Sequence, residues 1–296
     1  MLKNKVECVC DTKDQLGESP IWVEEKNSIF CVDIKRSIIH QLNIKNNIHT
    51  SWSFNDSIES IGCIAHIKNN KFVAGTKNGF RFIDLNTNEL SHIANPEEDL
   101  KNNRFNDGKC DNQGRFYAGT MNDFNNAPTG SFYILYNDLT YKKIDGSYEV
   151  TNGPAFSNDY KKIYFTDTRQ GKIYSANLNS DGTIKEKKLF ISISPKEGNP
   201  DGMTLDEEGY IWVAIFGGSC VNRYNKKGKL VDKIELPTSC ITSCVFGGEN
   251  FDVLFITTAS FKLTKEQEVN EPQAGSLFKI DLKIRGNKTN KFIHKV

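Results

Sequence analysis

Four polar residues, far apart in the chain, each stand at the start of an apolar, strand-like run. They are Glu18, Asn106, Asn152 and Asp201. Together they offer carboxylate and amide oxygens, without histidine or cysteine, and ligands of this kind suit a hard cation such as Ca²⁺, Mg²⁺ or Mn²⁺. A single residue of this kind would be explained by its place in a turn, because Asn, Asp and Gly are common before strands. Four of them at matching points indicate a binding site.

The segment 199–214 shows the layout most clearly. Asp201 is held between Pro200 and Gly202, a turn follows at 206–209, and the apolar run 210–214 comes next. Glycine permits the positive φ of a tight turn, and aromatic and β-branched residues suit a pleated sheet, so the segment predicts strand, turn and strand. Segments 106–120 and 152–166 repeat this layout.

The repeat extends over nearly the whole chain. Equivalent points at 19, 62, 106, 152, 201 and 242 are separated by 43, 44, 46, 49 and 41 residues, and each unit offers about four short strands. This period predicts an all-β fold, a six-bladed β-propeller with four-stranded blades, in a single domain spanning 1–296. The lone strand-like segment 5–10 has no other blade to join, so we expect it to close the last blade beside 275–281 and remove an exposed edge.

In a propeller the innermost strands line the central channel, so the starts of these strands gather at one mouth. The fold therefore brings the four polar residues together. Two other segments have no place in the repeat: 262–273 predicts a long surface loop, and 285–291 predicts a polar terminus.

Composition excludes several classes of function. The chain has 296 residues, with 38 basic and 37 acidic side chains and a net charge of +1, so no clustered basic surface for nucleic acid is indicated. No apolar run approaches a membrane span of about 20 residues, and no signal peptide is visible at the N-terminus. We expect a cytoplasmic protein without nucleic-acid or membrane partners, whose eight cysteines are reduced.

Several motifs in order give the chain a specific resemblance from about residue 15 to 282. It resembles the senescence-marker/gluconolactonase/regucalcin-like family of six-bladed propellers. The segments that carry the likeness are Gly17-Glu-Ser-Pro-Ile-Trp22, Arg104-Phe-Asn-Asp-Gly-Lys109, Ala118-Gly-Thr-Met121, Asn152-Gly, Pro200-Asp-Gly-Met203 and Thr242-Ser-Cys-Val-Phe-Gly-Gly248.

The resemblance implies roles for particular residues. The family's metal ligands map to Glu18, Asn152 and Asp201, and its substrate-binding Arg-x-Asn maps to Arg104 and Asn106. Members close to regucalcin carry a further acid shortly after Ala-Gly-Thr-Met. Asp123 is the only acid in that segment here, and we assign it to substrate binding on this likeness. The cofactor implied is one divalent cation, first of all Ca²⁺, with Zn²⁺, Mg²⁺ and Mn²⁺ as alternatives.

The function implied is metal-dependent hydrolysis of a sugar lactone, gluconolactone-like, to the aldonic acid. A divalent cation can polarise the carbonyl and activate water, Asp201 is ligand and candidate general base, and Arg104 can stabilise developing negative charge. A serine esterase is not indicated, since no Gly-x-Ser-x-Gly occurs. Two alternatives stay open: a calcium-binding regulatory protein, and a hydrolase of another ester on the same metal site.

Overall fold

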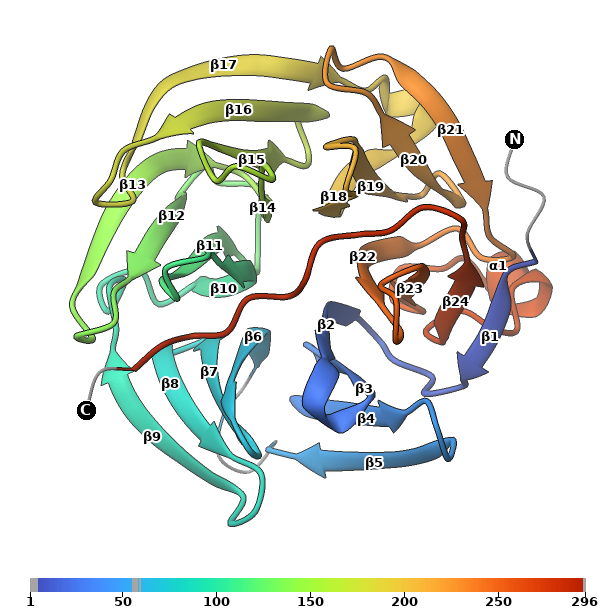
Figure 1. Cartoon of the computed structure of the whole chain (residues 1–296), viewed down its shortest axis with the longest axis horizontal. Coiled ribbons are helices and arrows are strands. Elements are labelled where there is room, and N and C mark those ends of the chain that lie inside the picture. The colour runs from blue at the N-terminus through green and yellow to red at the C-terminus, as the bar shows by residue number, and fades with distance from the viewer. Residues whose placement is uncertain (1–4, 55–57, 59, 295–296) are drawn as a thin grey trace.

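A computed structural model describes residues 5–54, 58 and 60–294. Six antiparallel sheets of four strands stand in a ring around a central channel (Figure 1). The predicted six-bladed β-propeller is therefore confirmed.

In each blade the four strands follow one another from the channel outwards. Blades 1 to 3 contain β2 (Gly17–Val23), β3 (Ser28–Asp33), β4 (Ile38–Asn43) and β5 (Ile48–Ser53); β6 (Ile61–Lys68), β7 (Lys71–Thr76), β8 (Gly79–Asp84) and β9 (Glu89–Ala94); and β10 (Asn103–Cys110), β11 (Phe116–Asn122), β12 (Gly130–Leu135) and β13 (Tyr141–Tyr148). Blades 4 to 6 contain β14 (Thr151–Phe156), β15 (Lys162–Asp167), β16 (Lys172–Leu178) and β17 (Ile184–Ser192); β18 (Asn199–Leu205), β19 (Ile211–Phe216), β20 (Cys220–Tyr224) and β21 (Leu230–Glu235); and β22 (Ile241–Gly247), β23 (Val253–Thr258), β24 (Leu277–Asp281) and β1 (Glu7–Cys10).

The sixth blade is closed by the N-terminal strand, as the sequence predicted. β1 pairs antiparallel with β24, with Glu7 opposite Lys279 and Cys8 opposite Phe278. The ring therefore ends in a sheet built from both termini of the chain, and β24 has no exposed edge.

We expect deletion of residues 1–11 to lower the melting temperature by more than about 5 °C. The deletion removes β1, bares the edge of β24 and takes the half-buried Cys8 away from the core. In a chain of this size each kcal/mol lost shifts the midpoint by roughly 2 °C. Deletion of residues 1–4, which leaves β1 whole, is the matched control for thermal unfolding followed by circular dichroism. An equal midpoint in the two deletions would contradict closure by β1.

The hydrophobic core is divided among the six interfaces between neighbouring blades. Each of six buried clusters joins two blades: the cluster around Phe30 and Phe72 joins blades 1 and 2, and the cluster around Trp212 and Phe246 joins blades 5 and 6. Burial falls from the channel outwards, so β2 is buried throughout whereas β5 is mostly exposed. Side chains on the innermost strands are thus held from both sides, which favours precise placement of a site.

A buried aspartate organises the turn after two innermost strands. Asp206 Oδ1 accepts a hydrogen bond from the Tyr210 N–H (2.9 Å), and its Oδ2 accepts one from Trp212 Nε1 (2.9 Å). Gly209 has φ +76°, the left-handed conformation that glycine adopts without strain. Asp111 and Gly114 repeat the arrangement in blade 3. The predicted strand–turn–strand units are confirmed, and in blades 3 and 5 an aspartate organises the turn.

The segment 262–273, predicted as a loop, contains the short helix α1 (Lys265–Asn270). Thr264 caps this helix: its hydroxyl accepts from the Gln267 N–H, and the Gln267 side chain accepts from the Thr264 N–H. The helix is exposed, which agrees with the surface position predicted. Two 3₁₀ turns, Glu24–Lys26 and Pro195–Glu197, complete the helical structure described. In the described part of the chain, no helix has the length and apolar character to cross a membrane.

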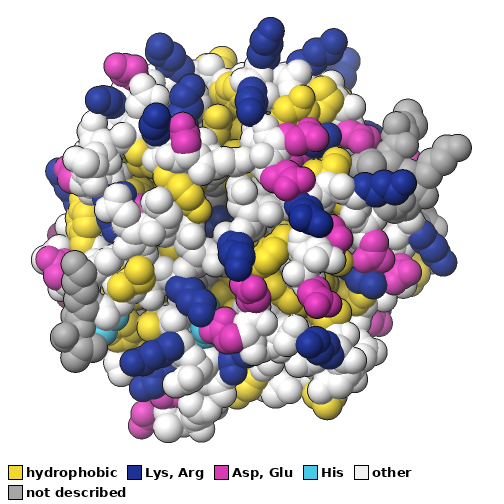
Figure 2. All heavy atoms as spheres, viewed as in Figure 1, with side chains coloured by type: hydrophobic (Ala, Val, Ile, Leu, Met, Phe, Trp, Pro, Cys, Tyr) yellow, Lys and Arg dark blue, Asp and Glu magenta, His cyan; other side chains and the backbone are white. Residues whose placement is uncertain are grey.

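The segment 282–294 does more than form the polar terminus that was expected. It runs across one end of the propeller, over the channel axis (Figure 1). Backbone N–H groups of Asn287 and Phe292 donate to the carbonyls of Leu205 (3.4 Å) and His66 (2.8 Å), which lie on different blades. Figure 2 shows the same face filled at its centre, with acidic and basic side chains mixed across it.

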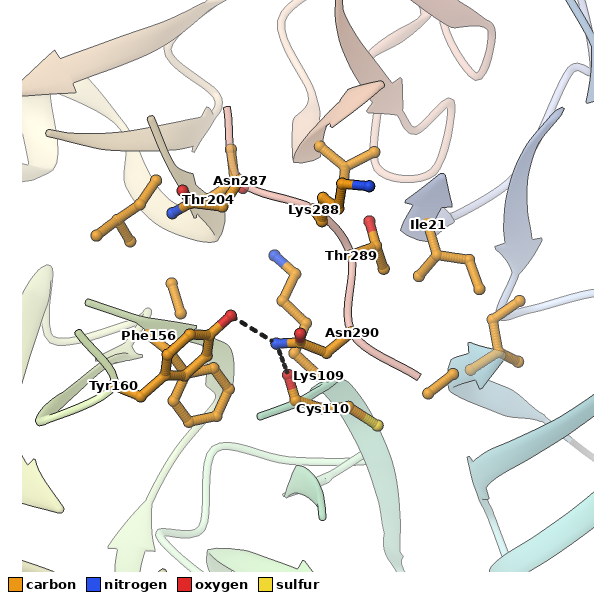
Figure 3. A pocket seen from close by; sticks show the side chains of 15 residues that line it. Ile21, Lys109, Cys110, Phe156, Tyr160, Thr204, Asn287, Lys288, Thr289 and Asn290 are labelled. Atoms are coloured by element: carbon orange, nitrogen blue, oxygen red, sulfur yellow. Dashed lines mark hydrogen bonds between the residues drawn. The ribbon is translucent and has the colours of Figure 1, made fainter. Parts of the chain in front are cut away.

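A cavity of about 60 Å³ lies beneath this C-terminal segment (Figure 3). The Asn290 amide donates to the carbonyl of Cys110 (3.2 Å) and to the hydroxyl of Tyr160 (2.9 Å), which fixes the segment over the channel. The Lys109 side chain also lines the cavity, and its ammonium donates to the carbonyl of Met203. This end of the channel is therefore covered, and the opposite end is the one open to a reactant.

Candidate functional site

Irregular strand pairing places the predicted site residues at the uncovered end of the channel. The register shifts between Glu18 and Ile21, between Phe105 and Gly108, between Asn152 and Ala155, and between Pro200 and Met203. Such bulges bend a strand and change the direction of side chains. The same irregularity in four innermost strands lets polar side chains converge at the channel end, where regular strands would alternate between faces.

Glycine is required at one of these bulges by close approach of two blades. A Cβ on Gly202, next to Asp201, would lie 2.1 Å from the hydroxyl oxygen of Ser243 on β22. Any larger residue would force blades 5 and 6 apart and displace the neighbouring carboxylate. The Pro-Asp-Gly motif therefore places Asp201 as well as supplying it.

The three predicted metal ligands lie deep in the site. Glu18 and Asn152 are each 2% exposed, and Asp201 is 7% exposed. Asn152 Oδ1 accepts from Asn106 Nδ2 (3.0 Å), and Asn152 Nδ2 donates to the Thr168 hydroxyl (2.8 Å). In this orientation the amide oxygen of Asn152 is the acceptor on the side of Asn106. Asp201 Oδ1 is buried without a hydrogen-bond partner.

Burial raises the pKa of the Glu18 and Asp201 carboxyls well above their ordinary range. The neighbouring negative charge of Asp107 raises both further. Asp107 itself, which burial shifts to a pKa of about 6, accepts from the Gly108 N–H (2.7 Å) and the Gly153 N–H (2.9 Å). Three carboxyls thus share a space from which water is largely excluded. They are costly to ionise unless a cation joins them.

These donors fit a divalent cation held by oxygens. The set consists of two carboxylates and one amide oxygen, of which Asp201 Oδ1 has no other partner. Across residues 5–54, 58 and 60–294, no group of three or more His, Cys, Asp or Glu side chains could hold a metal ion. A site that uses Asn152 needs only two carboxylates, and its all-oxygen chemistry suits a hard cation better than a thiolate-binding metal.

The predicted substrate residues form a second network beside these ligands. The Arg104 guanidinium donates through Nε to Asp123 (2.7 Å) and through Nη1 to Asn106 Oδ1 (2.7 Å). The Asn106 amide in turn donates to Asn152 Oδ1. Asp123 also pairs with Lys35 (3.1 Å), and the positive charge of Arg104 lowers the pKa of Asp123 against the effect of its burial. A continuous chain of hydrogen bonds therefore links Asp123 to Asn152, a predicted metal ligand.

Five of the six predicted residues line one cavity of about 140 Å³: Glu18, Arg104, Asn106, Asn152 and Asp201. Asp123 does not line it. It lies behind Arg104 and fixes the direction of the guanidinium. The structure brings the whole set together, with Asp123 in a supporting position.

Sequence reasoning missed other residues of this site. Phe216, Phe261, Arg169 and Lys262 also line the cavity, and Asp107 lies beneath it. Arg169 and Lys262 come from loops joining the second and third strands of their blades, so a search restricted to innermost strands could not find them. Asp107 carried a signal, because it stands beside Asn106 and before Gly108 in the same motif as Arg104.

Comparison with known proteins agrees with the geometry. The profile of the SMP-30/Gluconolactonase/LRE-like region matches residues 16–260. Regucalcin of Homo sapiens is 33% identical over 293 residues, covering 93% of this chain and 94% of that protein. A Bacillus subtilis strain 168 protein, provisionally named sugar lactone lactonase YvrE, is 32% identical over 279 residues, covering 93% and 94%.

Among solved structures, regucalcin of Agrobacterium tumefaciens strain C58, described as a calcium-binding protein, superposes with a TM-score of 0.92. Its sequence is 25% identical, and the match covers 98% of this chain and 97% of that one. The family profile, the two related sequences and the solved structure all match the blades that contain the site residues. The chain belongs to the SMP-30/gluconolactonase/LRE-like family.

Proposed function

We propose that this protein hydrolyses a sugar-derived lactone to its aldonic acid with the help of one divalent cation. The description of its family includes gluconolactonase, and a relative from Bacillus subtilis is provisionally named a sugar lactone lactonase. These names support ester hydrolysis at this site, and the geometry supplies a reason for it.

One observation carries the proposal. A buried pair of carboxyls, Glu18 and Asp201, lies beside an arginine and an amide in a cavity at the uncovered end of the channel. Asp201 has an oxygen without a partner. The site thus combines a base, a fixed cation and hydrogen-bonding groups, which are the components that hydrolysis of a polyhydroxylated ester requires.

Glu18, Asn152 and Asp201 would hold the cation. When bound, a divalent cation supplies polarisation of a carbonyl oxygen and lowers the pKa of water towards neutrality. Ca²⁺ is our first expectation because all three donors are oxygens and a relative is described as calcium-binding. Zn²⁺, Mg²⁺ and Mn²⁺ are the alternatives to be tested.

The side chains of this protein would carry the remaining steps. The Asp201 carboxylate takes a proton from the water whose oxygen attacks the lactone carbonyl carbon. The bond from that carbon to the ring oxygen then breaks, and the departing alkoxide receives the proton, so that water has been added and the aldonic acid is formed. Arg104 neutralises negative charge on the carbonyl oxygen, and Asn106 orients the sugar hydroxyls.

The deciding experiment uses metal-stripped protein, a panel of aldonolactones and single metals added back. We expect hydrolysis, followed by acid release in a weakly buffered indicator assay, to be absent without metal and restored by one or more of Ca²⁺, Zn²⁺, Mg²⁺ and Mn²⁺. Simple carboxylic and phosphotriester substrates in the same assay test the other-ester alternative. Turnover of these esters without any turnover of lactones would replace the proposal.

A calcium-binding regulatory role is the second candidate. It is favoured by relatives named regucalcin, one of them described as a calcium-binding protein. Such a role needs the oxygens of Glu18, Asn152 and Asp201 but no base. Tight Ca²⁺ binding by calorimetry together with inertness towards every lactone and ester tested would favour it.

A further inference from the structure

Cations from three different blades lie at the end of the channel that holds the cavity. Lys35 lies between β3 and β4, Arg169 between β15 and β16, and Lys262 between β23 and β24. These three loops each join the second strand of a blade to its third, at the end of the channel where the site residues lie. The propeller therefore places positive charge around the mouth from several directions.

Contacts with one aromatic ring show that two of these loops meet. The ammonium of Lys262 lies 4.8 Å from the ring centre of Phe261, and the ammonium of Lys35 lies 5.4 Å from the same centre. Arg169 and Lys262 both line the cavity. Partial burial lowers the pKa of Lys262, the positive charges of Arg169 and Lys35 lower it further, and the negative charge of Asp123 raises it. Lys262 is thus close enough to Arg169 and Lys35 for their charges to repel its own.

Two of the three cations form no ion pair among the described residues. Lys35 shares Asp123 with Arg104, at 3.1 and 2.7 Å. Arg169 and Lys262 form no ion pair with any residue in the described part of the chain. By contrast, Arg115 pairs with Asp111, and Arg223 pairs with Asp206. Lys262 also has φ +69°, a left-handed backbone that a lysine rarely adopts.

The reaction proposed above does not use these two cations. Arg104, tied to Asn106, is the cation beside the ligands. A divalent cation would cancel the charges of Glu18 and Asp201, which leaves the rest of the cavity lining positive through Arg104, Arg169 and Lys262. A neutral sugar lactone gives Arg169 and Lys262 no anion to bind.

We propose that the preferred substrate is a lactone with a second, permanently ionised group, a phosphate or a carboxylate, held by Arg169 and Lys262 at the rim. This inference rests on the proposed lactonase function. Guanidinium and ammonium donors recognise either anion through charge-assisted hydrogen bonds. In this cavity the substrate would lie with its anion at the rim and its lactone carbonyl beside Asp201.

The test compares three lactones: D-glucono-1,5-lactone, its 6-phosphate and D-glucaro-1,4-lactone. At low salt we expect kcat/KM of the wild type to be at least about 10-fold higher for one of the anionic lactones than for the neutral one. The anion that is preferred identifies the source of the charge. The preference should shrink as ionic strength rises, because these side chains are exposed.

Two variants locate the effect. Arg169→Gln and Lys262→Gln should each lower the ratio of anionic to neutral kcat/KM by about 10-fold, mainly through KM. Lys265→Gln, on α1 three residues beyond Lys262, is the matched control and should leave the ratio unchanged. Equal ratios in wild type and both rim variants, with neutral lactone hydrolysed as well as the anionic ones, would overturn the proposal and leave the lactonase function standing.

Inertness towards all three lactones would instead contradict the proposed function. In that case the test of the rim site is the affinity of the protein for the corresponding products, measured by calorimetry. These products are D-gluconate, 6-phosphogluconate and D-glucarate. Binding of a product with two anionic groups that is lost in Arg169→Gln and Lys262→Gln would support the rim site. Absence of such binding in the wild type would refute it.

Discussion

Asp201→Asn is expected to lower lactone turnover at saturating metal by about 10² to 10⁴-fold, because it removes a positioned general base. The amide keeps one oxygen and nearly the same shape, so the substitution separates the base from the ligand. Burial raises the pKa of Asp201 above its ordinary range, which makes the carboxylate a stronger base than an exposed aspartate once it is ionised.

Loss of metal affinity must be separated from loss of the base. Asp201→Asn removes a negative charge from a ligand, so metal binding will weaken as well. Turnover should therefore be measured over a series of metal concentrations, with occupancy followed by calorimetry, and compared where both proteins are saturated. Arg104→Ala provides the contrast, since we expect it to harm substrate use while metal binding survives.

If metal-saturated Asp201→Asn hydrolyses lactones at the wild-type rate, another group accepts the proton. Asp107 would then be the next candidate, because it is a buried carboxyl close enough to raise the pKa of Asp201 through its charge.

The repeat in the sequence was sufficient to predict the ring. Each unit carries its own turn signals and apolar strands, and such local patterns determine strand order when every strand pairs with its sequence neighbour. Closure by β1 followed from the same reasoning, since a segment without a blade and a blade without an outer strand had to be partners. Convergence of Glu18, Asn106, Asn152 and Asp201 followed in turn from the symmetry of the ring, whereas Arg104 and Asp123 were assigned by the family resemblance.

Features outside the repeat could not be predicted in this way. The segment 282–294 is polar, and its position depends on single hydrogen bonds to several blades, such as that from Phe292 N–H to His66. Arg169 and Lys262 lie in loops whose sequence obeys no repeat. The bulges could have been predicted from the sequence, because glycine or proline interrupts each of these strand-like segments. The residues are Gly108, Gly153, Pro154 and Gly202.

Glu18→Gln is expected to weaken metal binding by at least about 100-fold, because a hard cation favours an anionic oxygen and only two anionic ligands are available. Thermal stabilisation measures the loss. At a metal concentration 100 times the wild-type Kd, binding stabilises the wild type by about 2.7 kcal/mol, and a variant that binds 100-fold more weakly gains only about 0.4 kcal/mol. Glu97→Gln, a carboxylate outside the cavity that accepts from Tyr133 and Thr120, is the matched control.

The same variant should change how stability depends on pH. Burial raises the pKa of Glu18 and Asp201 in the fold, so the metal-free native state binds more protons than the unfolded chain between the ordinary and the raised values. The free energy of unfolding of the metal-free protein therefore falls as pH rises through this range. Glu18→Gln removes one of these titrations, and its metal-free form should lose less stability between pH 5 and pH 8.

Metal reverses this trend in the wild type, since the cation binds the ionised carboxylates and releases their protons. The difference in melting temperature between metal-loaded and metal-free protein should thus be larger at pH 8 than at pH 5, and nearly flat in Glu18→Gln. Cys240→Ser, which changes a neighbouring thiol outside the ligand set, should behave like the wild type. Equal metal affinity in wild type and Glu18→Gln, or loss of binding in Cys240→Ser, would show that the ligand set is wrong.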